Sequence, residues 1–281
     1  MSDTRIALTI AGSDSSGGAG VQADLKTFAA LSVYGVSAIT AVTAQNTTGV
    51  TGVMPVTTDL VTAQIEAVAT DFTIHATKIG MLFDAAIVEA VAAAVEALEL
   101  PLVVVDPVMV AKSGDRLLDD DGVRAMCGEL LPRALLVTPN IPEAEVLSGR
   151  TIKTIDDVRA AAEIIYGEAG AAVVIKGGHS TADFAPGEPN DVLIDLLFDG
   201  HGFTELHTTR FDTAHTHGTG CTFSAAIAAR LALGDALVDA VARAQAFVSE
   251  AIRQAPGIGH GHGPLEHFWA VRQSARSQDP I

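Results

Sequence analysis

Short apolar runs rich in β-branched residues alternate along the chain with longer Ala-rich segments whose apolar positions follow a helical period. Several of the short runs are apolar throughout, as expected for strands of a parallel sheet that helices cover on both faces. The pattern predicts strands at residues 6–11, 36–43, 77–81, 102–105, 135–138 and 172–175. It predicts helices at residues 19–31, 59–69, 85–98, 219–232 and 236–252, the second of them capped by Asp59.

Two further strands, at residues 191–198 and 203–211, flank Asp199-Gly-His-Gly202, a composition typical of a hairpin turn. No repeat or break in composition divides the chain, and 48% of its 281 residues are hydrophobic, which is sufficient for one large core. We therefore expect an α/β protein with a single domain at residues 1–270. Residues 271–281 form a polar tail, and the chain is expected to be loose after Trp269.

The charge of the chain narrows the classes of partner. Its formal net charge is −17, which argues against a nucleic-acid partner, because phosphate backbones require clustered Lys and Arg. A small anion could still bind if backbone amides, a few cations or a metal held it locally. The start of the chain lacks the apolar stretch of a signal peptide, and the Ala-rich segment 85–100 contains three Glu residues. We therefore expect a cytoplasmic protein with no membrane span.

Polar residues follow three of the predicted strands, in Asp106-Pro107, Thr138-Pro-Asn140 and Lys176-Gly-Gly178. Ligands of open α/β sheets bind beyond the carboxyl ends of the strands, so these residues are expected to share one site. Asp106, Asn140 and Glu143 offer the oxygen atoms that Mg²⁺ prefers, although Glu143 could also be an ordinary acid of a first helical turn. Lys176 could reach phosphate oxygens or could lie at its strand end only to avoid burial.

A glycine-rich turn at residues 11–20 separates the first strand from the first helix. It lacks the Lys-Ser or Lys-Thr of a Walker A loop. The segment Gly18-Ala-Gly-Val-Gln-Ala23 matches the loose dinucleotide pattern, but no acid lies between Asp24 and Asp59 to bind a ribose. A turn that binds a small molecule is the favoured interpretation, and a simple flexible turn is the alternative.

A second glycine-rich segment, His217-Gly-Thr-Gly-Cys-Thr-Phe-Ser224, leads into an Ala-rich helix. Glycines before a helix N-terminus form a backbone site for phosphate, and the helix dipole there favours a Cys221 thiolate. Cys221 could instead be a small packing residue. Lys112 lies in a loop that could close over the site or could be plain surface. The pairs His215/His217 and His260/His262 lack the further ligands of a zinc site, although His217 could position phosphate.

Taken together, these motifs resemble the hydroxymethylpyrimidine and phosphomethylpyrimidine kinases of thiamine synthesis, in the ribokinase-like superfamily. The resemblance covers about residues 5 to 268. It rests on these segments: Ile10-Ala-Gly-Ser-Asp-Ser-Ser-Gly-Gly-Ala-Gly-Val-Gln-Ala-Asp24, Thr43-Ala-Gln-Asn46, Lys78-Ile-Gly-Met81, Val105-Asp-Pro-Val-Met109, Thr138-Pro-Asn-Ile-Pro-Glu143, Val174-Ile-Lys-Gly-Gly-His179 and His217-Gly-Thr-Gly-Cys-Thr-Phe-Ser224. It implies a three-layer α/β/α sandwich with a mostly parallel central sheet and a small β-flap, often as a homodimer. It also implies ATP as donor, Mg²⁺ as cofactor, and two successive phosphorylations, of the pyrimidine alcohol and then of its monophosphate.

The resemblance also implies roles for individual residues. Gln45 would hydrogen-bond the aminopyrimidine, in a pocket lined by Gly12, Asp24, Met81 and Val108. Asp106 and Glu143 would organise the metal, while Asn140, Lys176, Thr219 and His217 would contact the nucleotide phosphates. The segment from Gly218 through Gly220 to Cys221 would form an anion hole, in which Cys221 takes the place of the Asp that sugar kinases use as base. Three alternatives stay open: a pyridoxal kinase of the same fold, a non-catalytic sensor of pyrimidine vitamers, and a nicotinamide-dependent oxidoreductase.

Overall fold

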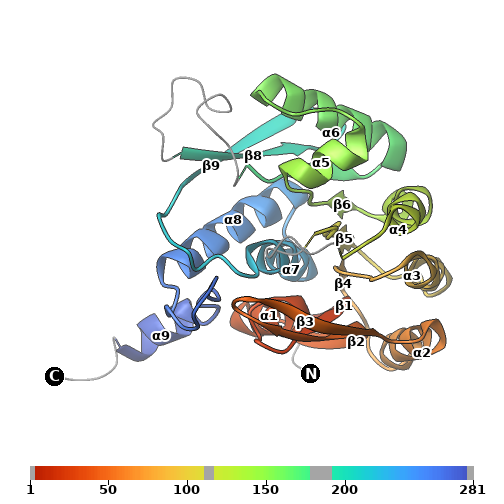
Figure 1. The fold of residues 1–281 in the computed structure, drawn as a ribbon, viewed down its shortest axis with the longest axis horizontal. Helices are drawn as coiled ribbons and strands as arrows, with labels where there is room; N and C mark the ends of the chain where they lie inside the picture. Colours follow the sequence, from red (N-terminus) through yellow and green to blue (C-terminus); the bar gives the residue numbers. More distant parts are fainter. Residues whose placement is uncertain (1–3, 111–116, 178–191, 277–281) are drawn as a thin grey trace.

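The computed structural model describes residues 4–110, 117–177 and 192–276. Within these ranges, nine strands form one sheet in the order β3-β2-β1-β4-β5-β6-β7-β8-β9 (Figure 1). The strands are β1 (Ile6–Asp14), β2 (Tyr34–Asn46), β3 (Gly49–Pro55), β4 (Ala76–Ile79), β5 (Val103–Val105), β6 (Leu136–Val137), β7 (Ala172–Ile175), β8 (Val192–Phe198) and β9 (Phe203–Thr209). Lys112, Gly178, His179 and Asp191 lie outside the described residues.

The centre of the sheet is parallel and its margins are antiparallel. Strands β2, β1, β4, β5, β6 and β7 run in one direction, as the apolar runs predict. The predicted hairpin of β8 and β9 is confirmed, and it extends the sheet beyond β7. Strand β3 was not predicted. It pairs antiparallel with the second half of β2, and this two-stranded ribbon fits the expected β-flap.

Helices cover both faces of the sheet, which confirms the three-layer α/β/α prediction (Figure 1). Helices α2, α3, α5 and α6 pack with η1 on one face, while α1, α7 and α8 pack on the other. The bounds are α1 (Gly20–Ala30), α2 (Thr58–Ala69), α3 (Ala85–Ala97), α4 (Asp120–Ala125), the π-helical turn η1 (Met126–Leu130), the 3₁₀ turn η2 (Leu131–Arg133), α5 (Ile141–Ser148), α6 (Ile155–Ala169), α7 (Thr219–Ala232), α8 (Leu237–Arg253) and α9 (Trp269–Arg276).

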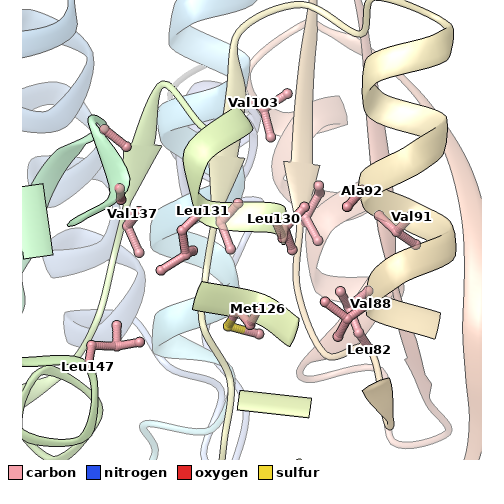
Figure 2. Close-up of a cluster of buried hydrophobic side chains, with 14 of the residues drawn as sticks. Leu82, Val88, Val91, Ala92, Val103, Met126, Leu130, Leu131, Val137 and Leu147 are labelled. Atoms are coloured by element: carbon pink, nitrogen blue, oxygen red, sulfur yellow. The ribbon is translucent and has the colours of Figure 1, made fainter. Parts of the chain in front are cut away.

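Two hydrophobic cores lie on opposite faces of the sheet because successive strand residues point to opposite sides. In β5, Val103 and Val105 contribute to one core and Val104 contributes to the other. Figure 2 shows the first core, where Val103 and Val137 meet side chains of α3, η1, η2 and α5. Both faces of the central strands are therefore buried. Polar side chains are found where these strands end.

Two local predictions were wrong. Helix α2 is preceded by Thr57 at its N-cap, and Asp59 lies within the first turn, so Asp59 is not the cap. The chain after Trp269 was expected to be loose, but α9 continues to Arg276. None of the described helices is long and apolar enough to cross a membrane.

Candidate active site

A cavity of about 840 Å³ opens at the carboxyl ends of the parallel strands. The fold thus brings together residues that are far apart in the sequence, as the strand-end argument predicts. Of the described residues to which the resemblance assigns a site role, only Asp24 does not line the cavity. The lining residues among them are Gly12, Gln45, Met81, Asp106, Val108, Asn140, Glu143, Lys176, His217, Gly218, Thr219, Gly220 and Cys221.

An ion pair occupies the middle of the cavity wall. Asp106, which follows β5 and is 2% exposed, accepts hydrogen bonds from Lys176 Nζ at 2.8 Å and from Thr138 Oγ1 at 3.1 Å. Burial lowers the pKa of Lys176, but the carboxylates of Asp106 and Glu143 outweigh burial and raise it above the usual value. Lys176 therefore stays protonated and carries a fixed positive charge toward the cavity.

Asn140 and Glu143 begin α5 through a reciprocal capping box. Asn140 Oδ1 accepts from the Glu143 amide at 2.9 Å, and Glu143 Oε2 accepts from the Asn140 amide at 2.8 Å. Burial raises the pKa of the Glu143 carboxyl to about 7, with Lys176 opposing this effect and Asp106 adding to it. Glu143 is thus a first-turn helix acid, the alternative left open by the sequence, and it also faces the cavity.

The N-terminus of α7 presents backbone amides to the same region. Gly218 is the N-cap residue, with φ of 81°, and no side chain caps the helix. An added Cβ on Gly218 would lie 1.8 Å from the Gly18 carbonyl oxygen, so this approach of the two loops requires glycine. The Thr219 hydroxyl donates to the Thr216 carbonyl at 2.8 Å. The positive end of the helix dipole is left available to an anion.

Gly220 brings the helix start close to the central ion pair. An added Cβ there would lie 3.3 Å from Lys176 Nζ and 3.4 Å from Asp106 Oδ2. An anion at the amides of α7 would therefore also be near the ammonium group of Lys176. The arrangement suits a phosphoryl group whose charge is shared between backbone and side-chain donors.

Cys221 differs from its prediction. The helix dipole was expected to lower its pKa, but burial raises the pKa of the thiol to about 11. Lys78 is the strongest opposing influence, while the carboxylates of Asp24 and Asp106 raise the pKa further. The sequence motif indicated the helix start but gave no sign that buried acids would surround it.

Gln45, His217 and Asp14 lie together at one end of the cavity. Gln45 Nε2 is 3.5 Å from His217 Nε2, and Gln45 Oε1 is 3.3 Å from Thr43 Oγ1, whose hydroxyl donates to the Ser13 carbonyl at 2.7 Å. His217 Nε2 in turn donates to Asp14 Oδ2 at 2.9 Å. Burial raises the pKa of Asp14, but hydrogen bonds from His217, Ser16 and Ala19 outweigh it and hold that pKa below its usual value. Gln45 thus presents its amide to the cavity, next to a buried His–Asp pair.

The glycine-rich turn after β1 is held by Asp14 and packs against the cavity. Asp14 Oδ2 accepts from the amides of Gly18 at 3.1 Å and Ala19 at 2.7 Å. These amides are therefore not free to hold a pyrophosphate, and the dinucleotide interpretation is wrong. Gly12 packs closely against Met81, since an added Cβ would lie 2.7 Å from Met81 Sδ.

Asp24 was expected to line the pyrimidine pocket, but its carboxylate is buried beneath the cavity and does not line it. Its Oδ2 atom accepts from Lys78 Nζ at 2.8 Å and from Thr9 Oγ1 at 2.6 Å. Lys78 itself lines the cavity, although the sequence argument used it only as part of a motif.

Sequence reasoning missed the other end of the cavity entirely. There the lining comes from the β8–β9 hairpin, the segment after it and α8, and it includes Leu193, Thr208, Phe211, Val248 and Ile252. Half-buried Asp195 accepts from the Gly177 amide at 2.8 Å and from Gln245 Nε2 at 2.9 Å, which fixes this end against β7. No motif marks these residues, because an apolar slot has no characteristic spacing.

The described residues contain no group of three or more His, Cys, Asp or Glu side chains placed to bind a metal. Of the histidines considered for zinc, His217 bonds Asp14, and His262 Nδ1 lies 3.1 Å from the Ala214 carbonyl oxygen. Any metal in this cavity would therefore depend on ligands besides protein side chains.

The sequence model of the phosphomethylpyrimidine kinase family matches residues 14–266. The hydroxymethylpyrimidine/phosphomethylpyrimidine kinase of Bacillus subtilis is 50% identical over 268 residues, covering 95% of this chain and 96% of the relative. The structure of pyridoxal kinase from Staphylococcus aureus with AMP-PCP and pyridoxal gives a TM-score of 0.85 at 38% identity, covering 96% of this chain and 95% of that one. A phosphomethylpyrimidine kinase structure from Clostridium difficile gives 0.77 at 40% identity, covering 89% and 100%.

Proposed function

The chain belongs to the phosphomethylpyrimidine kinase family, and on that premise we propose that it phosphorylates hydroxymethylpyrimidine and then its monophosphate for thiamine synthesis. ATP is the phosphoryl donor, in keeping with the AMP-PCP bound by a structural relative. One observation carries the proposal. A single cavity is lined by the Gln45 amide, by the Lys176–Asp106 pair next to the uncapped N-terminus of α7, and by an apolar slot.

The pyrimidine binds at the end that contains Gln45. A primary amide offers one acceptor and a donor group, which matches the edge of an aminopyrimidine. Thr43 and His217 lie beside this amide, and Gly12 and Met81 form the adjoining wall with Val108. The hydroxymethyl group of the substrate then points toward the start of α7.

The nucleotide binds across the remaining cavity. Its base occupies the slot formed by Leu193, Phe211, Val248 and Ile252, and its terminal phosphates lie between Lys176 and the α7 amides. Phosphoryl transfer is accelerated mainly by positioning and by stabilisation of charge on the transferred group. Lys176 and the amides from Gly218 to Cys221 supply that charge, while Thr219, His217 and Asn140 flank the phosphate path.

The residues present are compatible with Mg²⁺. Magnesium is commonly held by one or two carboxylates, water and substrate phosphates, so a full set of protein ligands is not required. Asp106 Oδ1 is engaged by Lys176 and Thr138, and Glu143 has an unusually high pKa of about 7 that a nearby cation would lower. Asp106 and Glu143 would hold the ion, which neutralises charge on the phosphates when bound.

Release of ADP with each candidate acceptor tests the proposal. We expect ADP release with hydroxymethylpyrimidine, and a higher kcat/KM than with pyridoxal, which the related Staphylococcus aureus enzyme binds. Equal or faster turnover of pyridoxal would reassign the substrate to the pyridoxal kinases. No ADP with either acceptor, while hydroxymethylpyrimidine still binds in calorimetry, would indicate a sensor.

The assembly and location of the enzyme are also part of the proposal. We propose a homodimer that acts in the cytoplasm, with residues 1–270 as one kinase domain. Light scattering of the purified protein measures the oligomeric state, and fractionation of cells that express the protein measures its compartment. A monomer at micromolar concentration would refute the dimer without affecting the proposed reaction.

A further inference from the structure

The backbone at Gln45 is held from outside strand β2. The pairing of β2 with β3 is irregular between Ala44 and Gln45, as in a β-bulge, a feature that often re-aims a side chain beside a site. The main-chain nitrogen of Gln45 donates to Ser15 Oγ at 2.9 Å, and that hydroxyl donates to the Thr43 carbonyl at 2.6 Å. One serine therefore bridges the backbone on both sides of residue 44, so adjustment of Gln45 to a ligand falls on its side chain.

The side-chain amide of Gln45 lies between two groups whose protons are already committed. Thr43 has a single hydroxyl proton, which it donates to the Ser13 carbonyl at 2.7 Å, so its oxygen can only accept from Gln45. His217 Nε2 lies 2.9 Å from Asp14 Oδ2, a carboxylate oxygen that accepts, so this ring nitrogen carries a proton. Thr43 therefore presents an acceptor to the amide, and His217 presents an N–H donor.

These two neighbours favour one orientation of the amide. Gln45 Oε1 lies 3.3 Å from Thr43 Oγ1 and Gln45 Nε2 lies 3.5 Å from His217 Nε2, so an acceptor faces an acceptor and a donor faces a donor. A half-turn about the last side-chain bond exchanges the oxygen and the nitrogen and leaves the rest of the residue in place. The nitrogen then donates to Thr43, the oxygen accepts from His217, and both mismatches become hydrogen bonds.

We propose that Thr43 and the His217–Asp14 pair determine specificity by holding the Gln45 amide in this turned orientation, so that the cavity accepts a 4-aminopyrimidine and excludes its 4-oxo counterpart. The inference rests on the proposed function and deepens its pyrimidine site. Each amide atom has one more bond to make, through the second N–H of the nitrogen and the second lone pair of the oxygen. In the turned orientation the N–H lies on the Thr43 side and the lone pair lies on the His217 side.

The edge of hydroxymethylpyrimidine (4-amino-5-hydroxymethyl-2-methylpyrimidine) matches this pattern in one direction. Its ring nitrogen accepts from Gln45 on the Thr43 side, and its amino group donates to Gln45 on the His217 side. The hydroxymethyl group is carried by the carbon next to the aminated one, so it also lies on the His217 side. His217 is followed by Gly218, the N-cap of α7, and the reacting hydroxyl is thereby directed to the proposed phosphate site. The opposite amide orientation would turn the ring over and direct the hydroxyl away from α7.

Calorimetry with two pyrimidines tests the inference without turnover. The probes are hydroxymethylpyrimidine and 5-hydroxymethyl-2-methylpyrimidin-4-one, whose oxygen accepts where the amino group donates and whose ring nitrogen carries a proton. A held amide should bind the amino compound on the order of 10²–10⁴-fold more tightly, because two groups are left unpaired against the oxo compound. An amide free to turn pairs with either edge, so affinities within about threefold of each other would overturn the inference.

The ratio of the two affinities also tests Thr43. Thr43→Val keeps the shape of the side chain but removes the acceptor, so the ratio should fall about tenfold, whereas Thr43→Ser keeps the hydroxyl and should keep the ratio. Thr40→Val is the matched control, because Thr40 is a buried residue of the same strand whose hydroxyl donates to the Met81 carbonyl at 2.7 Å. A merely structural role predicts that Thr43→Val weakens both ligands alike, and an unchanged ratio would refute the role of Thr43.

The outcomes separate this inference from the proposed function. A large affinity ratio without release of ADP would overturn the kinase activity and would support the held amide. Release of ADP with hydroxymethylpyrimidine, together with equal affinity for the two compounds, would overturn the inference alone. Circular dichroism checks the folding of each variant. If Thr43→Val does not fold, the comparison of the two ligands on the unaltered protein still decides whether the amide is held.

Discussion

Replacing Glu143 with Gln should stabilise the protein, and the gain should grow with pH. The folded protein raises the pKa of this carboxyl from 4.5 to about 7, mainly through burial. The folded state therefore binds the proton more tightly than the unfolded state does. The contribution of Glu143 to stability is present below pH 4.5 and is lost as the pH rises through 7. The difference between the two pKa values corresponds to about 3 kcal/mol.

Urea unfolding of the two proteins, followed by circular dichroism, measures this effect. The difference in unfolding free energy should increase by about 2–3 kcal/mol between pH 5 and pH 8. Gln at this position can still accept from the Asn140 amide, so the capping box that begins α5 is kept. Glu89→Gln is the control, because the Glu89 side chain on α3 stays in water.

A difference in stability that does not vary with pH would refute the reasoning. It would show that Glu143 ionises in the folded protein as easily as in the unfolded chain. The cavity would then hold two fully charged acids, Glu143 and Asp106, with Lys176 between them. If the expected increase is found, the protein retains an acid that costs stability, as is common where a carboxylate has a functional role. The Gln variant should accordingly lose turnover while it gains stability.

Three further outcomes are expected from the site. Excess EDTA should abolish kinase activity and added Mg²⁺ should restore it, whereas full activity in EDTA would exclude a role for the metal in the reaction. Asp106→Asn should raise the Mg²⁺ concentration needed for half-maximal activity. Gln45→Ala should lower kcat/KM for hydroxymethylpyrimidine by a factor that corresponds to a loss of roughly 1–3 kcal/mol in binding free energy, because partner groups are left unpaired. The same change should affect kcat/KM for pyridoxal less. Cys221→Ala should lower kcat of the first phosphorylation by roughly 10²–10⁴-fold, the range of general-base catalysis. Equal loss in both phosphorylations would assign Cys221 to phosphate positioning.

The sequence predicted the central sheet well because its signals are local. Runs such as Val103–Val105 are apolar on both faces, and only strands covered on both sides bury such runs. Strand β3 gave no such signal, since Gly49–Pro55 contains two glycines and a proline and its residues are largely exposed. Its structure comes from backbone pairing with β2, which a local pattern does not reveal. Helix α9 was missed for a similar reason, because its polar composition is typical of a loose terminus.

The site was predictable where a strand or helix end determines the position of a residue. Asp106, Asn140 and Lys176 follow successive strands, so the topology alone brings them to one edge. Asp24 and Cys221 show the limit of this reasoning. Matching Asp24 to a family motif does not reveal that its side chain turns beneath the cavity floor. The pKa of Cys221 depends on burial and on charges contributed by three other elements, whereas the sequence showed only the helix start.

The bond between Asp14 and His217 joins the first loop of the molecule to a segment 203 residues later. At ribosomal rates of about 5–20 residues per second, the loop after β1 emerges roughly 10–40 s before its partner is synthesised. In the first part of that interval, until Ala76–Ile79 is made, β1 also lacks β4, its neighbour on one side. Chaperones that shield exposed strand edges thus have a defined period in which to act. Both ends of the cavity are completed only when α7 and α8 arrive, so a nascent chain lacks the complete cavity until then.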